Sequence, residues 1–244
     1  MKQPEYKPVA LLHEDPDLFR SALNYSSAET LFIPRLLEKD YFCSLLLHYL
    51  SSTDETLVFK GGTCLAKVYA GFYRLSEDLD FVISASADSL RSVRSRKMAV
   101  TKKAISRISE KIGAFRLLQP LTGANNSTQY IAVVGYSSLL GKTEETIKIE
   151  IGLREPLLMP SSHCSVATIL LSPITGKPMI PTFPITCISY NEGMAEKFRA
   201  ALSRREPAIR DFYDIHYAIS HLNLNPKDAS FIDLIKTEAC RSRE

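Results

Sequence analysis

The sequence predicts an α+β protein that ends in a helical subdomain. Strand-like apolar runs are confined to the central part of the chain, whereas apolar residues at helical spacing dominate both ends. A stretch with six prolines between positions 156 and 184 separates the last helices from the rest. We therefore expect an α/β domain with N-terminal helices over 1–165, a Pro-rich connector over 166–187 and a helical subdomain over 188–244.

Local signals predict the individual elements. Pro34 suits the first turn of a helix, and apolar residues recur behind it at helical spacing. Gly61 and Gly62 end a short apolar strand, and a helix starts directly after them. Two later strands flank Gly141, which predicts a hairpin or neighbouring strands in one sheet. The predicted helices cover 17–23, 34–50, 63–69, 88–112, 191–205, 209–222 and 229–243, and the predicted strands cover 56–59, 79–83, 130–138 and 146–153. Residues 156–184 are expected to be loop-rich, with short extended pieces.

Composition excludes several classes of protein. Hydrophobic residues make up 45% of the chain and charged residues 23%, which excludes a disordered, collagen-like or fibrous protein. No apolar run approaches the roughly 18 residues of a membrane span, and no signal peptide is expected. The five cysteines are scattered singly, which disfavours a zinc site and a disulfide framework. We expect buried free thiols in a cytoplasmic protein.

Positive charge is concentrated in one segment. The net charge is +3, but residues 91–111 hold eight of the 30 Lys and Arg residues and one acid. This segment falls within the helix predicted over 88–112, whose expected apolar stripe consists of Val93, Val100, Ala104, Ile108 and Ile112. A basic stripe on one helix indicates a polyanionic partner such as RNA, with a merely solvated helix face as the alternative. The expected RNA contacts are Arg94, Lys97, Lys102, Lys103 and Arg107.

The segment most informative about chemistry covers residues 59–81, FKGGTCLAKVYAGFYRLSEDLDF. Two glycines let the backbone approach a ligand, and exposed amides at a helix start suit phosphate groups. Thr63 adds a hydroxyl to this cradle. Asp78 and Asp80 share one face of a strand because side chains alternate, while Leu79 points into the core. Two carboxylates beside a phosphate cradle suit one or two Mg²⁺ ions.

Further candidate residues lie on a later strand and on the C-terminal helices. Glu150 alternates with isoleucines and is the candidate third carboxylate, or alternatively a cross-strand partner of a Lys or Arg. Lys197 borders the apolar stripe of its helix, where a long cation can reach into a cleft. Asp211 and Asp214 lie three residues apart on one helical face. An ordinary amphipathic helix pair is the alternative interpretation of the C-terminal residues.

Together these motifs resemble the nucleotidyltransferase superfamily, whose first motif is Gly-Gly or Gly-Ser, a helix and then Asp-x-Asp. More narrowly, the chain is similar to the AbiEii/AbiGii toxin family. The similarity is carried by KGGTCL from Lys60, RLSEDLDF from Arg74, EKFRAA from Glu196 and RDFYD from Arg210. It implies a nucleotidyltransferase-type mixed sheet flanked by helices, with the catalytic domain over 1–165.

The resemblance also implies roles for individual residues. The glycine pair and Thr63 would hold the triphosphate of an NTP, and Lys197 would pair with the nucleotide phosphates. Asp211 would help to shape the site. The implied catalytic set is Asp78, Asp80, Glu150, Lys197 and Asp211, of which the first three bind Mg²⁺. The implied nucleotide-binding set is Lys60, Gly61, Gly62, Thr63, Arg74, Ser76 and Lys197.

The expected activity is Mg²⁺-dependent transfer of a nucleotide from an NTP to an acceptor hydroxyl. The acceptor would be RNA such as tRNA, and the protein would be the toxin of a toxin–antitoxin or phage-defence module with an antitoxin as partner. The alternatives are a small-molecule nucleotidyltransferase, a phosphotransferase and a non-catalytic RNA- or partner-binding module. The sequence leaves the NTP, the acceptor and the oligomeric state open.

Overall fold

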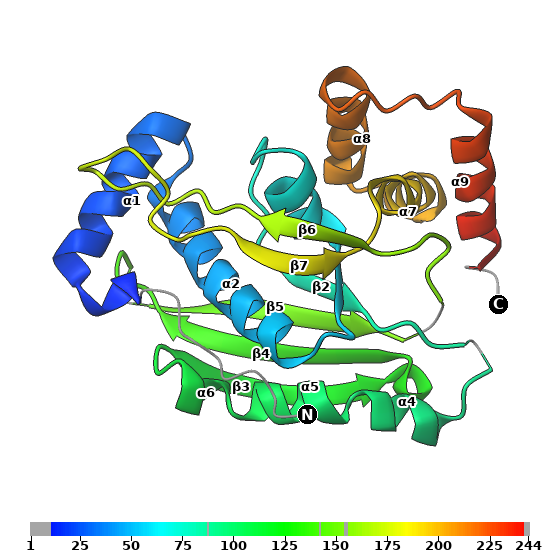
Figure 1. The fold of residues 1–244 in the computed structure, drawn as a ribbon, viewed down its shortest axis with the longest axis horizontal. Helices are drawn as coiled ribbons and strands as arrows, with labels where there is room; N and C mark the ends of the chain where they lie inside the picture. The colour runs from blue at the N-terminus through cyan, green and yellow to red at the C-terminus, as the bar shows by residue number, and fades with distance from the viewer. Residues whose placement is uncertain (1–10, 87, 142, 154–155, 242–244) are drawn as a thin grey trace. The chain divides into compact units, whose positions relative to one another are not determined.

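The structure, a computed structural model, describes residues 11–86, 88–141, 143–153 and 156–241 (Figure 1). Seven strands form one mixed sheet in the order β3-β4-β5-β2-β1-β7-β6. The chain divides into two compact units. The first comprises residues up to 156 and residues 163–186, and the second comprises residues 157–162 and the chain from 187 onward. This is the α+β class that the sequence predicts.

The elements follow one another from helices to sheet to helices. The strands are β1 (Val58–Lys60), β2 (Leu79–Val82), β3 (Phe115–Ala124), β4 (Gln129–Ser137), β5 (Glu144–Gly152), β6 (Ser162–Val166) and β7 (Phe183–Cys187). The helices are α1 (Pro16–Thr30), α2 (Pro34–Thr53), α3 (Gly61–Cys64), α4 (Arg91–Lys97), α5 (Ala99–Ser106), α6 (Ile108–Lys111), α7 (Tyr190–Ser203), α8 (Ile209–His221) and α9 (Ala229–Arg241). Helix α3 continues as a π-helical turn, Leu65–Tyr69.

Helix α2 is the central helix of the first unit. Every residue from Leu37 to Leu47 is buried, and Figure 1 shows α2 lying across β4 and β5. Phe42 stacks on Tyr136 of β4 with ring centroids 4.0 Å apart, and α2 also packs against α5. Helices α2 and α5 therefore cover the same face of the sheet. The buried isoleucines of β5, at 147, 149 and 151, point toward this face.

Three consecutive charged residues of α2 are buried, and each has a partner in another segment. Glu38 accepts hydrogen bonds from the Ser138 hydroxyl and the backbone N–H of Leu139. Lys39 Nζ lies 2.7 Å from Glu77, and Asp40 lies 2.6 Å from Lys67 Nζ. Burial raises the pKa of Asp40, against the opposing effect of Lys67. Buried charges are tolerated only when they are paired, so these contacts fix α2 to the segment after β4 and to the segment between α3 and β2.

The predicted helix over 88–112 is wrong in its continuity and in part of its buried face. The segment forms α4, α5 and α6, with breaks at Met98 and Arg107. Val93 and Val100, assigned to the apolar stripe, are 39% and 43% exposed. The other three residues of the predicted stripe, Ala104, Ile108 and Ile112, are buried, together with Arg94, Met98, Thr101 and Ile105. Arg94 can be buried because its guanidinium donates to the carbonyls of Ser89 and Asn126.

Two further expectations need correction. Strand β3 was not expected, because most of its side chains are exposed and it contains Pro120, which an edge strand tolerates. The predicted connector belongs largely to the first unit and contributes β7 and the end of β6 to the sheet.

All five cysteines are free thiols, as expected, but Cys164 is half-buried and Cys240 is exposed. Within the described residues, no helix has the length and apolar character needed to cross a membrane.

The second unit is helical. Helix α7 packs against α8 and α9, and Phe198 meets Phe231 edge to face at 5.5 Å. Ser189 caps α7 by accepting a hydrogen bond from the N–H of Glu192. The buried Glu192 carboxylate accepts hydrogen bonds from the backbone of Leu158 and Met159. This contact fixes the segment 157–162 to the helices.

Candidate active site

A row of charged residues crosses three neighbouring strands of the first unit. Strand β1 pairs antiparallel with β2, which places Lys60 opposite Asp80. Strand β2 pairs parallel with β5, which places Asp80 opposite Glu150. All three side chains point away from the face that α2 covers, because their neighbours Phe59, Phe81 and Ile149 are buried on that face.

The glycine turn lies directly against this row. Gly61 has a φ of +79°, and a Cβ atom built on it would lie 3.0 Å from Cγ of Asp80 and would overlap a carboxylate oxygen. A Cβ on Gly62 would lie 2.8 Å from Nη2 of Arg74 and 3.2 Å from Oγ of Ser76. The two glycines therefore let Asp80, Arg74 and Ser76 approach the backbone closely. Five of the predicted site residues are brought together here.

Thr63 makes a contact that the sequence did not predict. Its side chain is buried, and its hydroxyl donates a hydrogen bond to the backbone carbonyl of Asp78. The hydroxyl proton is thus already used within the protein, and the predicted contact of Thr63 with a triphosphate stays a prediction. The hydrogen bond fixes the backbone of Asp78 against α3, while Lys39 binds the neighbouring Glu77 side chain. Thr63 positions the acidic strand.

Both carboxylate oxygens of Glu150 have partners. Lys148 Nζ lies 2.6 Å from Oε2, and Gln129 Nε2 donates to Oε1 at 2.6 Å. Asn125 Nδ2 in turn donates to Oε1 of Gln129 at 3.1 Å. Sequence analysis missed Gln129 and Asn125, because their contacts depend on the pairing of β4 with β5. Lys148 could have been found, since it shares the face of Glu150 two residues away.

Electrostatics distinguish the two facing carboxyl groups. Burial, followed by repulsion from Glu150, raises the pKa of Asp80 to about 6. Burial also raises the pKa of Glu150, but the hydrogen bonds from Lys148 and Gln129 outweigh it and leave this pKa below its usual value. Asp80 is therefore the carboxyl group with the least compensated charge. A cation beside it would relieve the repulsion.

The carboxylates suit a hard divalent cation in donor chemistry but are not assembled around one position. Among the residues that the structure describes, no three His, Cys, Asp or Glu side chains are grouped closely enough to hold a metal ion. Asp78 is exposed and Asp80 is partly exposed, so both offer carboxylate oxygens, the ligands that Mg²⁺ prefers. Glu150 could join them only after rearranging its present contacts. The predicted three-carboxylate set thus remains a prediction.

In the second unit, Lys197 and Asp211 lie together in a buried charged cluster. Lys197 Nζ lies 2.5 Å from Asp214 and 3.8 Å from Asp211, and Arg204 also pairs with Asp211. The Lys197 side chain is 12% exposed and that of Asp214 is fully buried. The structure adds Arg204 to this cluster and makes Asp214, which the sequence grouped with Asp211, the nearest partner of Lys197. The spacing of the two aspartates on one helical face was the sequence signal for this cluster.

Four of the five predicted RNA contacts remain available at the surface. Arg94 does not, because it is buried and donates to two backbone carbonyls. Lys97 donates to the carbonyl of Ser84, and Lys102 Nζ lies 4.8 Å from the ring centroid of Tyr130. Lys103 and Arg107 are exposed on α5 and directly after it. These residues lie on the helix layer, on the opposite side of the sheet from Asp80.

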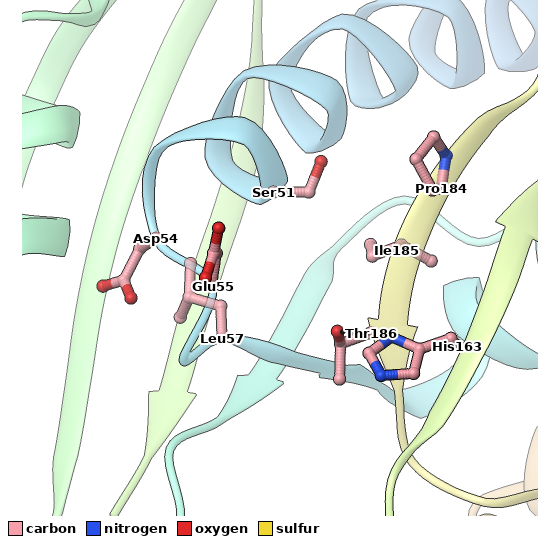
Figure 2. Close-up of a pocket in the computed structure, with 8 residues that line it drawn as sticks. All are labelled: Ser51, Asp54, Glu55, Leu57, His163, Pro184, Ile185 and Thr186. Carbon is pink, nitrogen blue, oxygen red and sulfur yellow. Dashed lines mark hydrogen bonds between the residues drawn. The ribbon is translucent and has the colours of Figure 1, made fainter. Parts of the chain in front are cut away.

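A small hollow elsewhere in the first unit is not the predicted site. Figure 2 shows its lining residues, Ser51, Asp54, Glu55, Leu57, His163, Pro184, Ile185 and Thr186. They come from the end of α2, the approach to β1, and strands β6 and β7. Its volume of about 120 Å³ is below the several hundred Å³ of typical nucleotide-sized pockets. None of the predicted site residues lines it.

Comparison with known proteins decides the family. The family described as nucleotidyl transferase AbiEii toxin of type IV toxin–antitoxin systems matches residues 44–244. The chain belongs to the AbiEii family. The glycine turn, Asp78, Asp80, Glu150, Lys197 and Asp211 all fall within the matched range. This match confirms the resemblance to the AbiEii nucleotidyltransferase toxins that the sequence motifs indicate.

Two solved structures are similar to this chain at low sequence identity. JHP933 from Helicobacter pylori is 20% identical over 88% of this chain and 73% of its own, with a TM-score of 0.48. A candidate nucleotidyltransferase from H. pylori is 19% identical over 84% of this chain and 72% of its own, with a TM-score of 0.47. No curated protein matches the sequence.

Proposed function

We propose that this AbiEii protein transfers a nucleotide from an NTP to an acceptor hydroxyl, with a requirement for Mg²⁺. One observation carries the proposal: Asp80 faces Glu150 across adjacent parallel strands and lies against the bare backbone of Gly61. A glycine turn beside paired carboxylates combines room for phosphates with ligands for a divalent cation. Membership of the AbiEii family supports the same chemistry.

The proposed reaction forms one P–O bond and breaks another. The acceptor hydroxyl oxygen attacks the α-phosphorus of the NTP, the hydroxyl proton passes to solvent, and pyrophosphate leaves with the bridging oxygen. Arg74 and Ser76, which lie over Gly62, would bind phosphate oxygens and hold the α-phosphorus in line with the acceptor. A divalent cation held by Asp78 and Asp80 would neutralise phosphate charge and lower the pKa of the attacking hydroxyl. Lys60, level with Asp80, adds positive charge on the other side.

For the second unit we propose that Lys197 pairs with the nucleotide phosphates and that Asp211 shapes its surroundings. The lysine and aspartate motifs of the resemblance support these roles. Asp214, at 2.5 Å, would hold the Lys197 ammonium in place. Arg204 would share the charge of Asp211, which leaves Asp214 as the nearest counter-ion of Lys197.

We propose RNA, such as tRNA, as the acceptor and a cognate antitoxin as the protein partner. Lys97, Lys102, Lys103 and Arg107 supply a basic surface for an RNA backbone, and phage defence would be a consequence of RNA modification. The toxin–antitoxin family supports the antitoxin partner. Because this surface and Asp80 lie on opposite sides of the sheet, the RNA would have to extend around its edge.

The test is incubation with each α-³²P-labelled NTP, Mg²⁺ and total RNA, followed by a denaturing gel. The expected result is label on an RNA band with one NTP, lost in Asp80→Asn and retained in Asp17→Asn, which changes an exposed acid of α1. Label on a small molecule instead would identify that molecule, and not RNA, as the acceptor. Absence of any labelled product from folded wild-type protein that binds NTP would overturn nucleotidyl transfer.

A further inference from the structure

Lys148 lies among the acidic residues of the proposed site. Its Nζ is 2.6 Å from Oε2 of Glu150, which lies two residues further along the same face of β5. Asp78 and Lys148 directly precede Leu79 and Ile149, which pair across the parallel strands β2 and β5. The hydrogen bond to Glu150 raises the pKa of Lys148, and the charges of Asp78 and Asp80 add to this effect. The Lys148 ammonium thus contacts Glu150 directly, and the charges of Asp78 and Asp80 act on it through space.

We infer that Lys148 is the built-in counter-ion of these carboxylates and that it releases Glu150 when a divalent cation binds. This inference rests on the proposed function, because it assumes that the carboxylates take up such a cation. It assigns a role to a residue that neither the motifs nor the family resemblance singles out. Without a divalent cation, the positive charge of Lys148 would reduce the repulsion between the carboxylates. The same charge would determine how tightly the site binds the cation.

The contacts of Glu150 indicate which partner gives way. Gln129 is neutral and is itself held by Asn125, so its hydrogen bond to Oε1 can persist beside a cation. Lys148 carries a full positive charge and would repel a divalent ion that shared the same carboxylate. Its side chain is 43% exposed, on a flexible four-carbon stem. Lys148 can therefore turn into solvent or toward a bound phosphate without disturbing the sheet.

The inference predicts that removal of the Lys148 charge strengthens cation binding. Binding of Mn²⁺ alone, without nucleotide, would be measured by calorimetry on wild type, Lys148→Gln and Lys148→Arg. We expect Lys148→Gln to bind Mn²⁺ about tenfold more tightly, because one nearby positive charge is gone but the site is partly screened by solvent. Lys148→Arg retains the charge and should bind within about twofold of wild type. Lys227→Gln removes an exposed lysine of the helical unit, outside the proposed RNA surface, and is the matched control.

A second readout needs no bound metal. Without divalent cations, Lys148→Gln should melt at a lower temperature than wild type, because the carboxylates lose their counter-ion, and saturating Mn²⁺ should close most of this gap. Lys148→Met provides the same charge deletion if the Gln variant does not fold. Unchanged or weaker Mn²⁺ binding in the charge-deleted variants would overturn the inference.

Two outcomes of the Mn²⁺ titrations distinguish a failure of this inference from a failure of the proposed function. If Asp80→Asn loses Mn²⁺ binding but Lys148→Gln binds Mn²⁺ as wild type does, the proposed cation site is supported and the role of Lys148 is refuted. No Mn²⁺ binding to wild type or to Lys148→Gln would overturn both the cation requirement and the inference.

Discussion

The carboxylate of Asp80 occupies the space that a side chain on Gly61 would need. Asp80 lies on β2, and Gly61 directly follows the neighbouring strand β1, whose last residue, Lys60, pairs with Asp80. The glycine turn and the Asp-x-Asp strand are therefore one structural unit, although almost twenty residues separate them in the sequence. This contact explains why the two motifs occur together.

Substitution of Gly61 tests that contact directly. Gly61→Ala places a methyl group into the Asp80 carboxylate at a positive φ, so we expect loss of activity and a cost of more than about 2 kcal/mol in unfolding free energy. Gly71 also has a positive φ, of +58°, but a Cβ there would meet nothing within 4 Å. Gly71→Ala should cost only about 1 kcal/mol and retain activity. Equal effects of the two substitutions in chemical denaturation would show that Asp80 does not require the glycine.

The buried ion pair between Lys197 and Asp214 should be costly to break from one side. Asp214→Ala leaves a mostly buried ammonium without its nearest partner, and we expect a loss of about 3 kcal/mol in unfolding free energy. The double variant Lys197→Met with Asp214→Leu should lose less than the single variant. Asp233→Ala, which breaks an exposed pair with Lys236, should cost below about 0.5 kcal/mol. A double variant that is less stable than Asp214→Ala would contradict the proposed cost of a buried unpaired charge.

His13 should contribute to a loss of stability in mild acid. Burial lowers the pKa of His13 below 6.5, against the opposing charge of Glu14, and Nδ1 lies 2.7 Å from the Tyr41 hydroxyl. The unfolded chain therefore binds a proton more readily, so this contribution is complete above about pH 6.5 and is lost as the pH falls through the lowered folded-state pKa. His13→Gln should reduce the difference in unfolding free energy between about pH 7.5 and about pH 5.5. His216→Gln, which changes an exposed histidine of α8, is the control; an equal reduction in both variants would refute the role of His13.

Substitutions on the basic surface should affect RNA binding, whereas substitution of the buried Arg94 should affect stability. Lys103→Glu and Arg107→Glu should weaken RNA binding and each reduce the slope of log affinity against log salt by about 1, with little change in stability. Arg94→Ala should instead lower the unfolding free energy by about 1–3 kcal/mol, because it leaves the carbonyls of Ser89 and Asn126 without their donor. Lys227→Glu, at an exposed lysine of the helical unit, controls for net charge. Salt slopes that do not distinguish the surface variants from Lys227→Glu would assign the basic surface to solvation.

The sequence predicted those features that depend on local pattern. The alternation around Asp80 and Glu150 identified two strands and the face that carries the carboxylates, and the glycine pair marked the turn beside them. The register that places Asp80 opposite Glu150 was not available, because it depends on the pairing of β2 with β5 across some seventy residues. The helix pattern of α7 and α8 likewise indicated that Asp211 and Asp214 share a face, but not that both lie close to Lys197.

The features that the sequence did not predict depend on contacts between distant residues. Arg94 looked like one of several surface cations, and only its hydrogen bonds to residues 89 and 126 explain its burial. Thr63 looked like a phosphate ligand, although its hydroxyl holds the backbone of Asp78. Strand β3 lacks clear alternation because it is a largely exposed edge strand. In each case the local pattern fitted a simpler interpretation than the one that tertiary contacts impose.

The most direct test of the central claim compares the fate of two labels in one NTP. Wild-type protein would be incubated with α-³²P-labelled and γ-³²P-labelled samples of the preferred NTP, with Asp80→Asn and Asp17→Asn in parallel. Nucleotidyl transfer at the Asp80 site predicts that the α label enters the acceptor and the γ label leaves as pyrophosphate, in wild type and Asp17→Asn but not in Asp80→Asn. Transfer of the γ label to the acceptor, or undiminished transfer by folded Asp80→Asn, would contradict it.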